Sequence, residues 1–266
     1  MTKPRVFVYS WRDFDEAPLF EKYAKEFGFE LGYTEGIPRY DDLDILKGYE
    51  YVSVITTPID ASMLDRMKEL GVKMLCTRTI GYNHIDIEHA KSIGMVVTNV
   101  SYDPIGVAEY TVMMMLMAIR KLRAIGERGA VNDFSLKGLL GKELRNCTVG
   151  IVGAGQIGTT VLRILSGFGC RLLYSNRREK KEASELAEYV PMDDLLAQSD
   201  IVSLHLELNP ETEHMFGKEQ FSKMKKDAYF VNTSRGPLVD TAALVEAVES
   251  GTIACAAVDV IENEFD

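Results

Sequence analysis

The sequence predicts an α/β protein made of two doubly wound domains, each built on a parallel sheet. Three observations favour this fold class. Strand-like apolar runs alternate with helix-like stretches along the chain, which is the pattern of βαβ units. A glycine-rich turn at residues 153–158 joins one apolar run to a helix-like stretch. The length of 266 residues is enough for about two domains.

The first predicted domain comprises residues 1–101, where short strands alternate with helices. Four strands are expected where β-branched and other apolar residues cluster, at residues 6–9, 51–55, 73–77 and 95–100. Three helices are expected among them, at residues 18–27, 61–70 and 86–93. This order favours a small parallel sheet, and the domain has no glycine fingerprint of its own.

The second predicted domain comprises residues 102–266 and begins with one long helix at residues 107–131. The helix has an apolar stripe that includes Met113 and Leu116, so it is expected in the core or at a subunit interface. Asp240 is the expected N-cap of a later helix, and Gly251 is its expected end. The expected strands are 148–152, 171–174, 201–204, 228–232 and 253–258, with helices that include 157–168 and 242–249.

A Gly-x-Gly-x-x-Gly pattern at Gly153, Gly155 and Gly158 follows the strand at 148–152. Gly153 allows a tight turn, Gly155 allows the backbone to approach a pyrophosphate, and Gly158 allows the helix to pack on the strand. The free N–H groups at the start of the next helix favour phosphate. The pattern predicts a Rossmann dinucleotide-binding domain; the alternative is a glycine-rich βα turn without a ligand.

The residues after the strand at 171–174 bear on the choice of cofactor. An NAD site has an acidic residue near this point to bind the ribose 2′-OH, but this chain has Ser175, Asn176, Arg177 and Arg178. Guanidinium groups bind phosphate in a bidentate manner. We therefore expect NADP(H) to be preferred, with NAD(H) possible and with Arg177 and Arg178 at the 2′-phosphate. The alternative is a solvated basic run.

Composition excludes several classes of partner. A net charge of −10 and a pI near 5.0 argue against nucleic acid and anionic membranes. The longest apolar run, at 112–119, is too short to span a bilayer. No signal-peptide pattern precedes the first strand, and the four cysteines lack paired spacing. We expect buried thiols, a cytoplasmic protein, and no metal site, because the four histidines have no ligand spacing.

Polar residues at the carboxyl ends of the predicted strands are the candidate site, because ligands of doubly wound sheets bind there. They include His205, residues 233–236 and residues 259–264. Arg235 lies between an apolar strand and a Gly-Pro turn. On position alone it is either a catalytic cation directed at the ligand or a surface residue that pairs with Asp240.

Three segments carry a resemblance to a known family. They are Asn-Thr-Ser-Arg-Gly-Pro-Leu-Val-Asp at 232–240, Ala-Val-Asp-Val at 257–260 with Glu264, and Cys-Thr-Arg-Thr-Ile-Gly-Tyr-Asn-His-Ile-Asp at 76–86. From about residue 72 onward the chain resembles the D-2-hydroxyacid dehydrogenases, especially D-lactate dehydrogenases, including the vancomycin-resistance type. The resemblance implies a flavodoxin-like substrate domain followed by a Rossmann domain.

The resemblance also implies roles for individual residues. Arg235 is expected to bind a 2-oxo acid and polarise its carbonyl, and Glu264 to raise the pKa of a catalytic histidine. The backbone N–H groups at Ile80, Gly81 and Tyr82 are expected to bind the substrate carboxylate, with Tyr102 in the pocket. The expected cofactor contacts are Gln156 and Ile157 at the pyrophosphate, Leu206, Glu207, Thr212 and Thr233 at the adenosine and ribose, Asp259 at the carboxamide, and also Asn176, Ser234 and Arg235. The usual His-x-Pro of this family is His205-Leu206-Glu207 here.

In the family, the acid/base histidine follows the position of Glu264 by some distance, together with helices that return to the first domain. None of the four histidines occupies that place, so the sequence is expected to be a fragment or a truncated enzyme. The resemblance implies reduction of pyruvate or a related 2-oxo acid, and Arg177 and Arg178 predict that NADP(H) supplies the hydride. The long helix at 107–131 favours a homodimer. The alternatives are a nicotinamide sensor that resembles the corepressors, and a formate or phosphite dehydrogenase relative.

Overall fold

The computed structural model describes residues 3–264. The chain divides into two compact units, Met1–Tyr102 and Asp103–Asp266. The division lies one residue beyond the predicted one. Both units are parallel α/β sheets, as predicted. Within the described part of the chain, every helix is too short or too polar to cross a bilayer.

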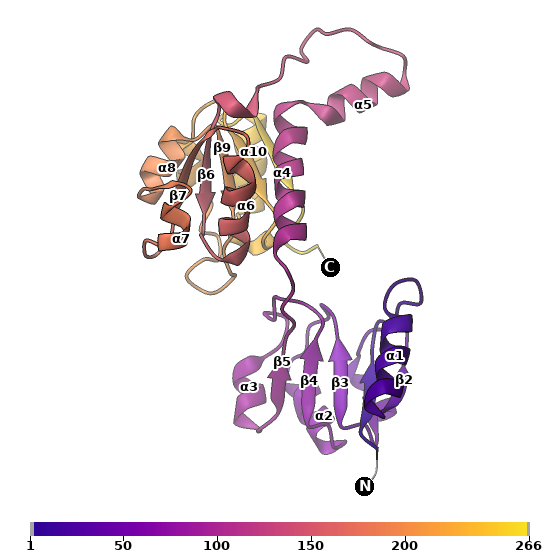
Figure 1. Cartoon of the computed structure of the whole chain (residues 1–266). Coiled ribbons are helices and arrows are strands. Elements are labelled where there is room, and N and C mark those ends of the chain that lie inside the picture. Colours follow the sequence, from indigo (N-terminus) through magenta and orange to yellow (C-terminus); the bar gives the residue numbers. More distant parts are fainter. Residues whose placement is uncertain (1–2, 265–266) are drawn as a thin grey trace. The chain divides into compact units, whose positions relative to one another are not determined.

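The first unit contains a five-stranded parallel sheet in the order β2-β1-β3-β4-β5 (Figure 1). The strands are β1 (Arg5–Val8), β2 (Glu30–Tyr33), β3 (Tyr51–Val54), β4 (Met74–Thr77) and β5 (Val96–Thr98). The helices are α1 (Ala17–Phe27), α2 (Ala61–Glu69) and α3 (Ile87–Ser92), with a 3-10 helix η1 at Tyr40–Leu46. Asp60 and Asp86 cap α2 and α3 by accepting the N–H groups of Met63 and His89, both at 2.9 Å.

Strand β2 was not predicted from the sequence. Its residues, Glu-Leu-Gly-Tyr, have little of the β-branched character that marks a strand. A Cβ at Gly32 would overlap the ring of Tyr49, so packing rather than strand propensity determines this residue. The pairing of β2 with β1 makes it an edge strand of the sheet.

The second unit contains a six-stranded parallel sheet in the order β11-β10-β9-β6-β7-β8 (Figure 1). The chain proceeds outward from β6 through β7 and β8, and then returns to the other side of β6 to form β9, β10 and β11. Ligands of such sheets bind where the strand order reverses, beyond the carboxyl ends of the strands. The strands are β6 (Thr148–Val152), β7 (Arg171–Ser175), β8 (Glu188–Tyr189), β9 (Ile201–Leu204), β10 (Tyr229–Asn232) and β11 (Cys255–Val258).

The single helix predicted at 107–131 is wrong. Two helices, α4 (Ile105–Ile119) and α5 (Leu122–Ala130), replace it. Lys121 has a left-handed φ of 55°, which ends the first helix and redirects the chain. Figure 1 shows α5 and the segment after it projecting from the body of this unit. We call residues 122–140 the arm. The apolar periodicity continues across the break, so it could not indicate where α4 ends.

The other helices of the second unit surround its sheet. They are α6 (Gln156–Ser166), α7 (Lys181–Ser184), α8 (Met192–Gln198), α9 (Lys218–Lys223) and α10 (Thr241–Glu249), with 3-10 helices η2 (Leu144–Asn146) and η3 (Gly236–Leu238). Asp240 caps α10 through the N–H of Ala243 at 3.0 Å, as predicted. Gly251 follows the helix with a φ of +71°, also as predicted.

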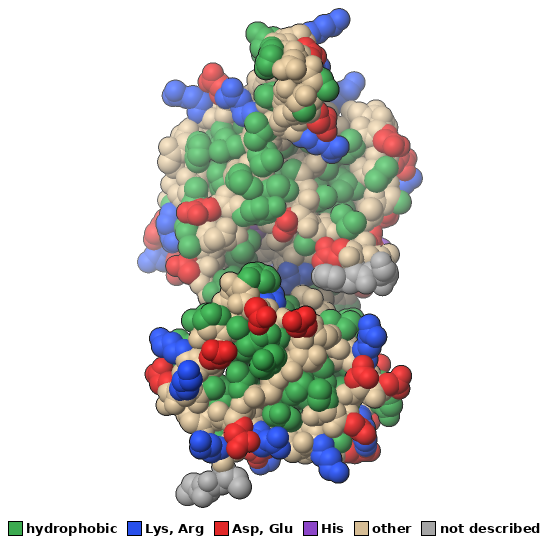
Figure 2. All heavy atoms as spheres, turned by 90° about the vertical axis from the view of Figure 1, so that its right-hand side faces the viewer, with side chains coloured by type: hydrophobic (Ala, Val, Ile, Leu, Met, Phe, Trp, Pro, Cys, Tyr) green, Lys and Arg blue, Asp and Glu red, His purple; other side chains and the backbone are tan. Residues whose placement is uncertain are grey.

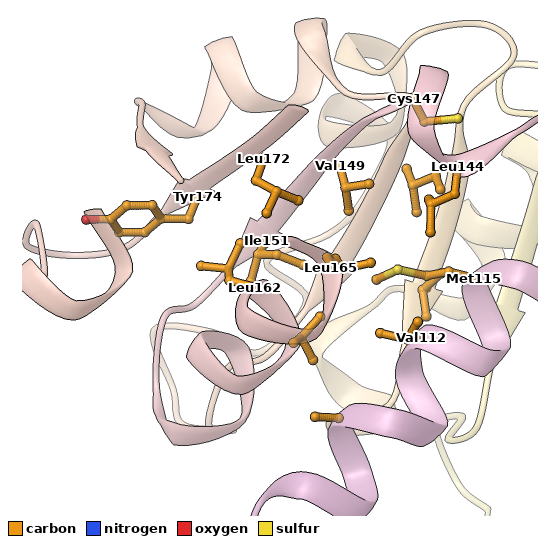
Figure 3. Packing of buried hydrophobic residues seen from close by; sticks show 14 of the residues in the cluster. Val112, Met115, Leu144, Cys147, Val149, Ile151, Leu162, Leu165, Leu172 and Tyr174 are labelled. Atoms are coloured by element: carbon orange, nitrogen blue, oxygen red, sulfur yellow. The ribbon is translucent and has the colours of Figure 1, made fainter. Parts of the chain in front are cut away.

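One core cluster of the second unit joins α4 and α6 to the sheet (Figure 3). Val149 and Ile151 of β6 contribute to it with Leu165 of α6 and Met115 of α4, all fully buried. Burial of each such side chain stabilises the fold by about 1.5–3 kcal/mol. This core fixes α6 and therefore the glycine-rich turn that precedes it.

The four cysteines are free thiols. Cys147 is buried, but Cys76, Cys170 and Cys255 are only partly buried, so the prediction of buried thiols is wrong for these three. Cys76 lies in β4, Cys170 immediately precedes β7, and Cys255 begins the edge strand β11. Burial raises the pKa of the Cys147 and Cys255 thiols, which keeps them protonated near neutral pH.

Candidate active site

The glycine-rich turn lies between β6 and α6, and its three glycines serve different purposes. Gly153 has a φ of +94°, and a Cβ there would overlap the carbonyl oxygen of His205. A Cβ at Gly158 would overlap the carbonyl oxygen of Gly153. At Gly155, in contrast, a Cβ would meet nothing within 4 Å. Two glycines are therefore required by the fold, whereas the third faces open space that a ligand can occupy.

The N-terminus of α6 adjoins that open space. The N–H groups of Gln156, Ile157 and Gly158 have no acceptor among residues 3–264, as is usual for the first turn of a helix. Ile157 packs its side chain against the core, so only its backbone can contact a phosphate. Three free donors, an open glycine and the positive end of the helix dipole fit a dinucleotide pyrophosphate.

Asn176 organises the turn after β7. Its Oδ1 accepts the N–H of Ala154 at 3.4 Å, and its Nδ2 donates to the carbonyl of Arg178 at 2.9 Å. Arg177 and Arg178 are exposed. Within the described residues, neither guanidinium forms a hydrogen bond or an ion pair. The turn therefore presents two uncompensated cations beside the glycine-rich turn.

His205 follows β9 and lies behind the glycine-rich turn. Its Nε2 is 3.0 Å from the hydroxyl of the buried Ser203. Burial lowers the pKa of His205 to about 4, so it is neutral at pH 7. Its carbonyl oxygen and Cβ occupy the space next to Gly153 and Gly158. His205 is thus a packing residue of the turn and is poorly suited to donate a proton.

The segment after His205, residues 206–212, is held mostly by hydrogen bonds between its own residues. The Thr212 hydroxyl donates to the carbonyl of Glu207 at 2.7 Å and accepts the N–H of Asn209 at 2.9 Å. Leu206 is partly buried against the core, and Glu207 is exposed. Of the expected contacts here, Leu206 lies closest to Gly153, while the Thr212 hydroxyl is occupied within its loop.

A network of short polar contacts fixes the turn after β10. The buried Asn232 donates to the carbonyl of Arg235 at 2.9 Å and accepts the N–H of Ser234 at 3.0 Å. The Ser234 hydroxyl donates to the carbonyl of Leu204 at 2.7 Å. Thr233 is 2.8 Å from the Thr111 hydroxyl of α4, measured between the two oxygens.

Arg235 is half-buried at this turn, and its Nη1 donates to the carbonyl of Ser234 at 2.6 Å. The alternative pairing with Asp240 is wrong. Asp240 caps α10, and no ion pair joins it to Arg235 among the described residues. The guanidinium therefore lies at the carboxyl edge of the sheet, on the same edge as the glycine-rich turn.

Residues 259–264, which we call the acid loop, follow β11 at this edge. Asp259 accepts the phenol O–H of Tyr110 at 3.1 Å, and the exposed Glu264 accepts the N–H of Ile261 at 3.3 Å. A Cβ at Gly236 would overlap the carbonyl of Ile261. The turn that carries Arg235 and the loop that carries Glu264 are therefore in direct backbone contact.

Glu262 anchors the acid loop, a role that was not predicted although residues 259–264 were part of the candidate site. Its carboxylate accepts the N–H of Thr241 at 2.7 Å and pairs with the imidazole of His214. This pairing raises the pKa of His214 despite an opposing contribution from burial. In the sequence, Glu262 lies two residues before Glu264. This spacing alone could not show which of the two carboxylates anchors the loop and which one faces the reaction.

A second candidate anion site lies in the first unit, in the loop after β4. Asn99 Nδ2 donates to the carbonyl of Ile80 at 2.8 Å, and the Thr79 hydroxyl donates to the carbonyl of Gly81 at 2.6 Å. The backbone N–H groups of Ile80, Gly81 and Tyr82 have no acceptor among residues 3–264. Side chains thus occupy the carbonyls and leave consecutive N–H donors for a ligand. Tyr82 and Tyr102 are both exposed.

Comparison with known proteins decides the family. Residues 112–265 match the family described as "D-isomer specific 2-hydroxyacid dehydrogenase, NAD binding domain". The chain belongs to the D-isomer specific 2-hydroxyacid dehydrogenases. It is an oxidoreductase, and its second unit is a Rossmann domain that binds a nicotinamide cofactor.

Named relatives agree with this assignment to the D-isomer specific 2-hydroxyacid dehydrogenases. The D-specific alpha-keto acid dehydrogenase of Enterococcus faecium is 48% identical over 94% of this chain and 77% of its own length. The apo-structure of D-lactate dehydrogenase from Escherichia coli has a TM-score of 0.87 at 36% identity, over 98% of this chain and 84% of that chain. The NAD+ complex of D-lactate dehydrogenase from Lactobacillus jensenii has a TM-score of 0.79 at 33% identity, over 98% and 80%.

In this D-isomer specific 2-hydroxyacid dehydrogenase, the predicted residues form two groups. One edge of the second sheet brings together the glycine-rich turn, residues 176–178, the turn that carries Arg235, and the acid loop. The loop at residues 80–82 belongs to the first unit. Tyr110 and His214, which were not predicted as site residues, support the acid loop through side-chain hydrogen bonds, and so does Glu262, whose anchoring role was not predicted.

Proposed function

We propose that the protein reduces a 2-oxo acid to the D-2-hydroxy acid, with NADP(H) as the preferred cofactor. The observation that carries this proposal is the edge of the second sheet, where an open α6 N-terminus, a fixed Arg235 and a carboxylate-bearing loop adjoin. A bound nicotinamide cofactor supplies the hydride. The substrate and cofactor contacts are assigned to residues of this chain, and Glu264 is assigned the support of the histidine that supplies the proton.

The substrate groups are assigned to Arg235 and to the loop at residues 80–82. Arg235 binds the carboxylate and carbonyl of the 2-oxo acid, and its positive charge stabilises the oxyanion that develops as the carbonyl is reduced. The N–H groups of Ile80, Gly81 and Tyr82 bind the carboxylate, and Tyr102 contributes to the pocket. We assign residues 1–101 as the substrate domain on this basis.

Glu264 is assigned an indirect role in proton transfer, as the carboxylate that supports the proton-donating histidine. A carboxylate hydrogen-bonded to an imidazole raises its pKa and keeps it available as an acid. The resemblance places that histidine after residue 264, and none of the histidines in this sequence takes that place. The chain spans 77–84% of the length of the three relatives above.

The cofactor is assigned to residues 102–266. Gly153, Gly155 and Gly158 with Gln156 and Ile157 hold the pyrophosphate, and Asp259 binds the nicotinamide carboxamide. The adenosine and ribose side is assigned to Asn176, Leu206, Glu207, Thr212, Thr233 and Ser234. Because the Thr212 hydroxyl is already used within its loop, we assign Thr212 a role in shaping that loop.

The preference for NADP(H) rests on Arg177 and Arg178. Both side chains are exposed, and neither guanidinium forms an ion pair within residues 3–264. The residue directly after β7 is Asn176 rather than a carboxylate that would repel a 2′-phosphate. Replacing both by glutamine is expected to raise the KM for NADPH by at least about tenfold and to change the KM for NADH little. A wild-type enzyme with a lower KM for NADH than for NADPH contradicts this assignment.

The substrate is proposed to be pyruvate or a bulkier 2-oxo acid. The relatives are named for D-lactate and for alpha-keto acids, and the exposed Tyr82 and Tyr102 suit a hydroxyacid better than a one-carbon or inorganic donor. The sensor alternative has no observation in its favour. The four free thiols support a reducing compartment, and we propose the cytoplasm.

We further propose that the protein is a homodimer that uses the arm and α4. On the arm, Phe134 is 79% exposed, Leu136 86% and Leu140 89%. Figure 2 shows apolar side chains on the projecting arm and over the unit that carries it. Contiguous exposed apolar surface of this kind is typical of subunit interfaces. Light scattering is expected to give twice the chain mass, and serine at Leu136 and Leu140 to give the monomer.

The decisive test is pyruvate-dependent oxidation of NADPH by the wild type and by Arg235→Gln. The substitution removes the cation that stabilises the developing oxyanion, so kcat/KM is expected to fall by at least about 10²-fold. Turnover that barely changes in R235Q contradicts the assignment. Cofactor binding without turnover of any 2-oxo acid, measured with the enzyme that includes the histidine that Glu264 supports, favours a sensor.

A further inference from the structure

Arg78 lies at the end of β4, immediately before the loop at residues 80–82. We propose that Arg78 is a positioning residue for substrate binding, whose buried guanidinium holds this loop in the form that binds a carboxylate. The inference rests on the proposed function, since that function assigns the substrate carboxylate to the loop. Arg78 was not among the residues expected to bind substrate or cofactor.

The guanidinium is directed into the protein, and each of its three nitrogens donates at least one hydrogen bond. The Arg78 side chain is 11% exposed. Its Nε donates to Glu16 at 3.0 Å, its Nη1 to the hydroxyl of Ser53 at 3.0 Å, and its Nη2 to the carbonyls of Tyr9 at 3.0 Å and Ser10 at 3.2 Å. With all three nitrogens engaged, Arg78 supports the loop rather than binding the substrate itself.

The partners of Arg78 lie on separate segments of the first unit. Tyr9 and Ser10 follow β1, Ser53 belongs to β3, and Glu16 immediately precedes α1. The Arg78 N–H also donates to the carbonyl of Val54 at 2.9 Å. One side chain therefore connects the carboxyl ends of three neighbouring strands, which is the edge where a doubly wound sheet binds its ligands.

Backbone conformation around the guanidinium supports its role as an anchor. Ser10 has a left-handed φ of 52°, a conformation that costs a non-glycine residue energy. Its carbonyl is one of the two that accept from Arg78 Nη2. A planar fork with donors in several fixed directions satisfies these acceptors together, whereas a lysine ammonium of the same charge cannot.

The loop after Arg78 has its carbonyls fixed and its N–H groups free. Asn99 and Thr79 occupy the carbonyls of Ile80 and Gly81, so the peptide planes are held while three N–H groups have no acceptor in the described chain. Arg78 fixes the start of this loop, and Asn99 fixes its middle. If the start of the loop becomes less ordered, the N–H donors of residues 80–82 are expected to be misaligned and to bind a carboxylate more weakly. Cofactor binding by the other unit is expected to be unaffected.

The test uses the full chain and compares Arg78→Lys with the wild type. R78K keeps the charge but loses the fork, so the KM for pyruvate is expected to rise by about tenfold. A donor set that binds the carboxylate equally in the ground and transition states affects KM more than kcat. We expect kcat to change by less than about threefold and the Kd for NADPH, measured by fluorescence, by less than about twofold.

Arg66→Lys is the matched control. Arg66 belongs to α2 of the same unit and is likewise held by an ion pair, in its case with the carboxylates of Asp44 and Glu69. It lies away from the loop in sequence and in hydrogen bonding. R66K is expected to leave KM, kcat and Kd unchanged. Ser53→Ala, which removes one acceptor of the fork, is a milder second variant in case R78K does not fold, with an expected rise in KM of about threefold.

An unchanged pyruvate KM in R78K or, where that variant does not fold, in S53A overturns the proposal. A KM and an NADPH Kd that rise by the same factor also overturn it, because they indicate general loosening of the protein. If the wild type reduces no 2-oxo acid, the proposed function fails separately. Titration of cofactor-loaded protein with oxamate, a pyruvate analogue, then decides the role of Arg78: weaker binding in R78K supports it, and equal or absent binding contradicts it.

Discussion

Two regions of this protein have consecutive backbone N–H groups without an acceptor among residues 3–264, and they leave these donors open to an anion in different ways. In the second unit, glycine removes the side chains and α6 supplies donors from its first turn. In the first unit, the side chains of Thr79 and Asn99 occupy the carbonyls of an irregular loop. The first arrangement depends on the absence of side chains at the glycines. The second depends on side-chain hydrogen bonds, one of which joins Asn99 to Ile80 across 19 positions.

The largest effect is expected from Gly158→Val, which tests whether close packing against residue 153 requires a glycine at this position. Even a Cβ at residue 158 would overlap the carbonyl of Gly153, and the remaining methyl groups cannot be accommodated without moving α6. We expect a loss of at least about 3 kcal/mol in the free energy of unfolding. Thermal or urea unfolding of the protein without cofactor measures it. Wild-type stability in G158V would show that the turn has more freedom than its contacts indicate.

Gly155→Ala separates packing from ligand approach at the same turn. A Cβ at residue 155 meets nothing within 4 Å, so the stability without cofactor is expected to stay within about 0.5 kcal/mol of the wild type. The added methyl occupies space assigned to the pyrophosphate, and the Kd for NADPH is expected to rise by at least about tenfold. Calorimetric titration provides the measurement. An unchanged Kd places the pyrophosphate elsewhere.

Asn99→Ala applies the same question to the loop of the first unit. It leaves the exposed carbonyl of Ile80 to water, so the loss of unfolding free energy is expected to be about 1 kcal/mol or less. The loop becomes less ordered, and the KM for pyruvate is expected to rise by about threefold while the Kd for NADPH stays constant. Steady-state kinetics with both substrates check this, and a change confined to NADPH would contradict the assignment of the loop.

The smallest effect is expected from the pair of His214 and Glu262. The carboxylate raises the folded-state pKa of His214 above its unfolded value. The stabilisation is therefore complete below about pH 6.5 and disappears as the pH rises through the folded-state pKa. Both partners are partly solvent-exposed, so we expect less than about 1 kcal/mol. Melting temperatures of the wild type and His214→Gln should differ at pH 6 and converge by pH 9; a constant difference contradicts the charge pairing.

Much of the fold could be predicted because short buried strands and cap residues are local signals. The strand at 148–152 and the cap at Asp240 depend on residues within a few positions of each other. Strand β2 and the break at Lys121 could not be predicted. Gly32 is determined by the ring of Tyr49, and the left-handed Lys121 interrupts an apolar periodicity that itself continues.

The candidate site shows the same division. The glycine-rich turn and the turn at Arg235 could be recognised because their residues are consecutive. The anchors could not, since Glu262 meets His214 across 48 positions and Arg78 meets Tyr9 across 69. His205 stood at the right strand end for chemistry, yet burial against the glycines lowers its pKa and makes it a packing residue.

The missing side chain at Gly236 has a consequence for how this enzyme can change over evolution. Because the backbone there contacts Ile261, the turn that carries Arg235 and the loop that carries Glu264 are packed directly against each other. Neither can be relocated alone, so new substrate preferences are expected to arise through the first unit, whose loop is held by exchangeable side chains.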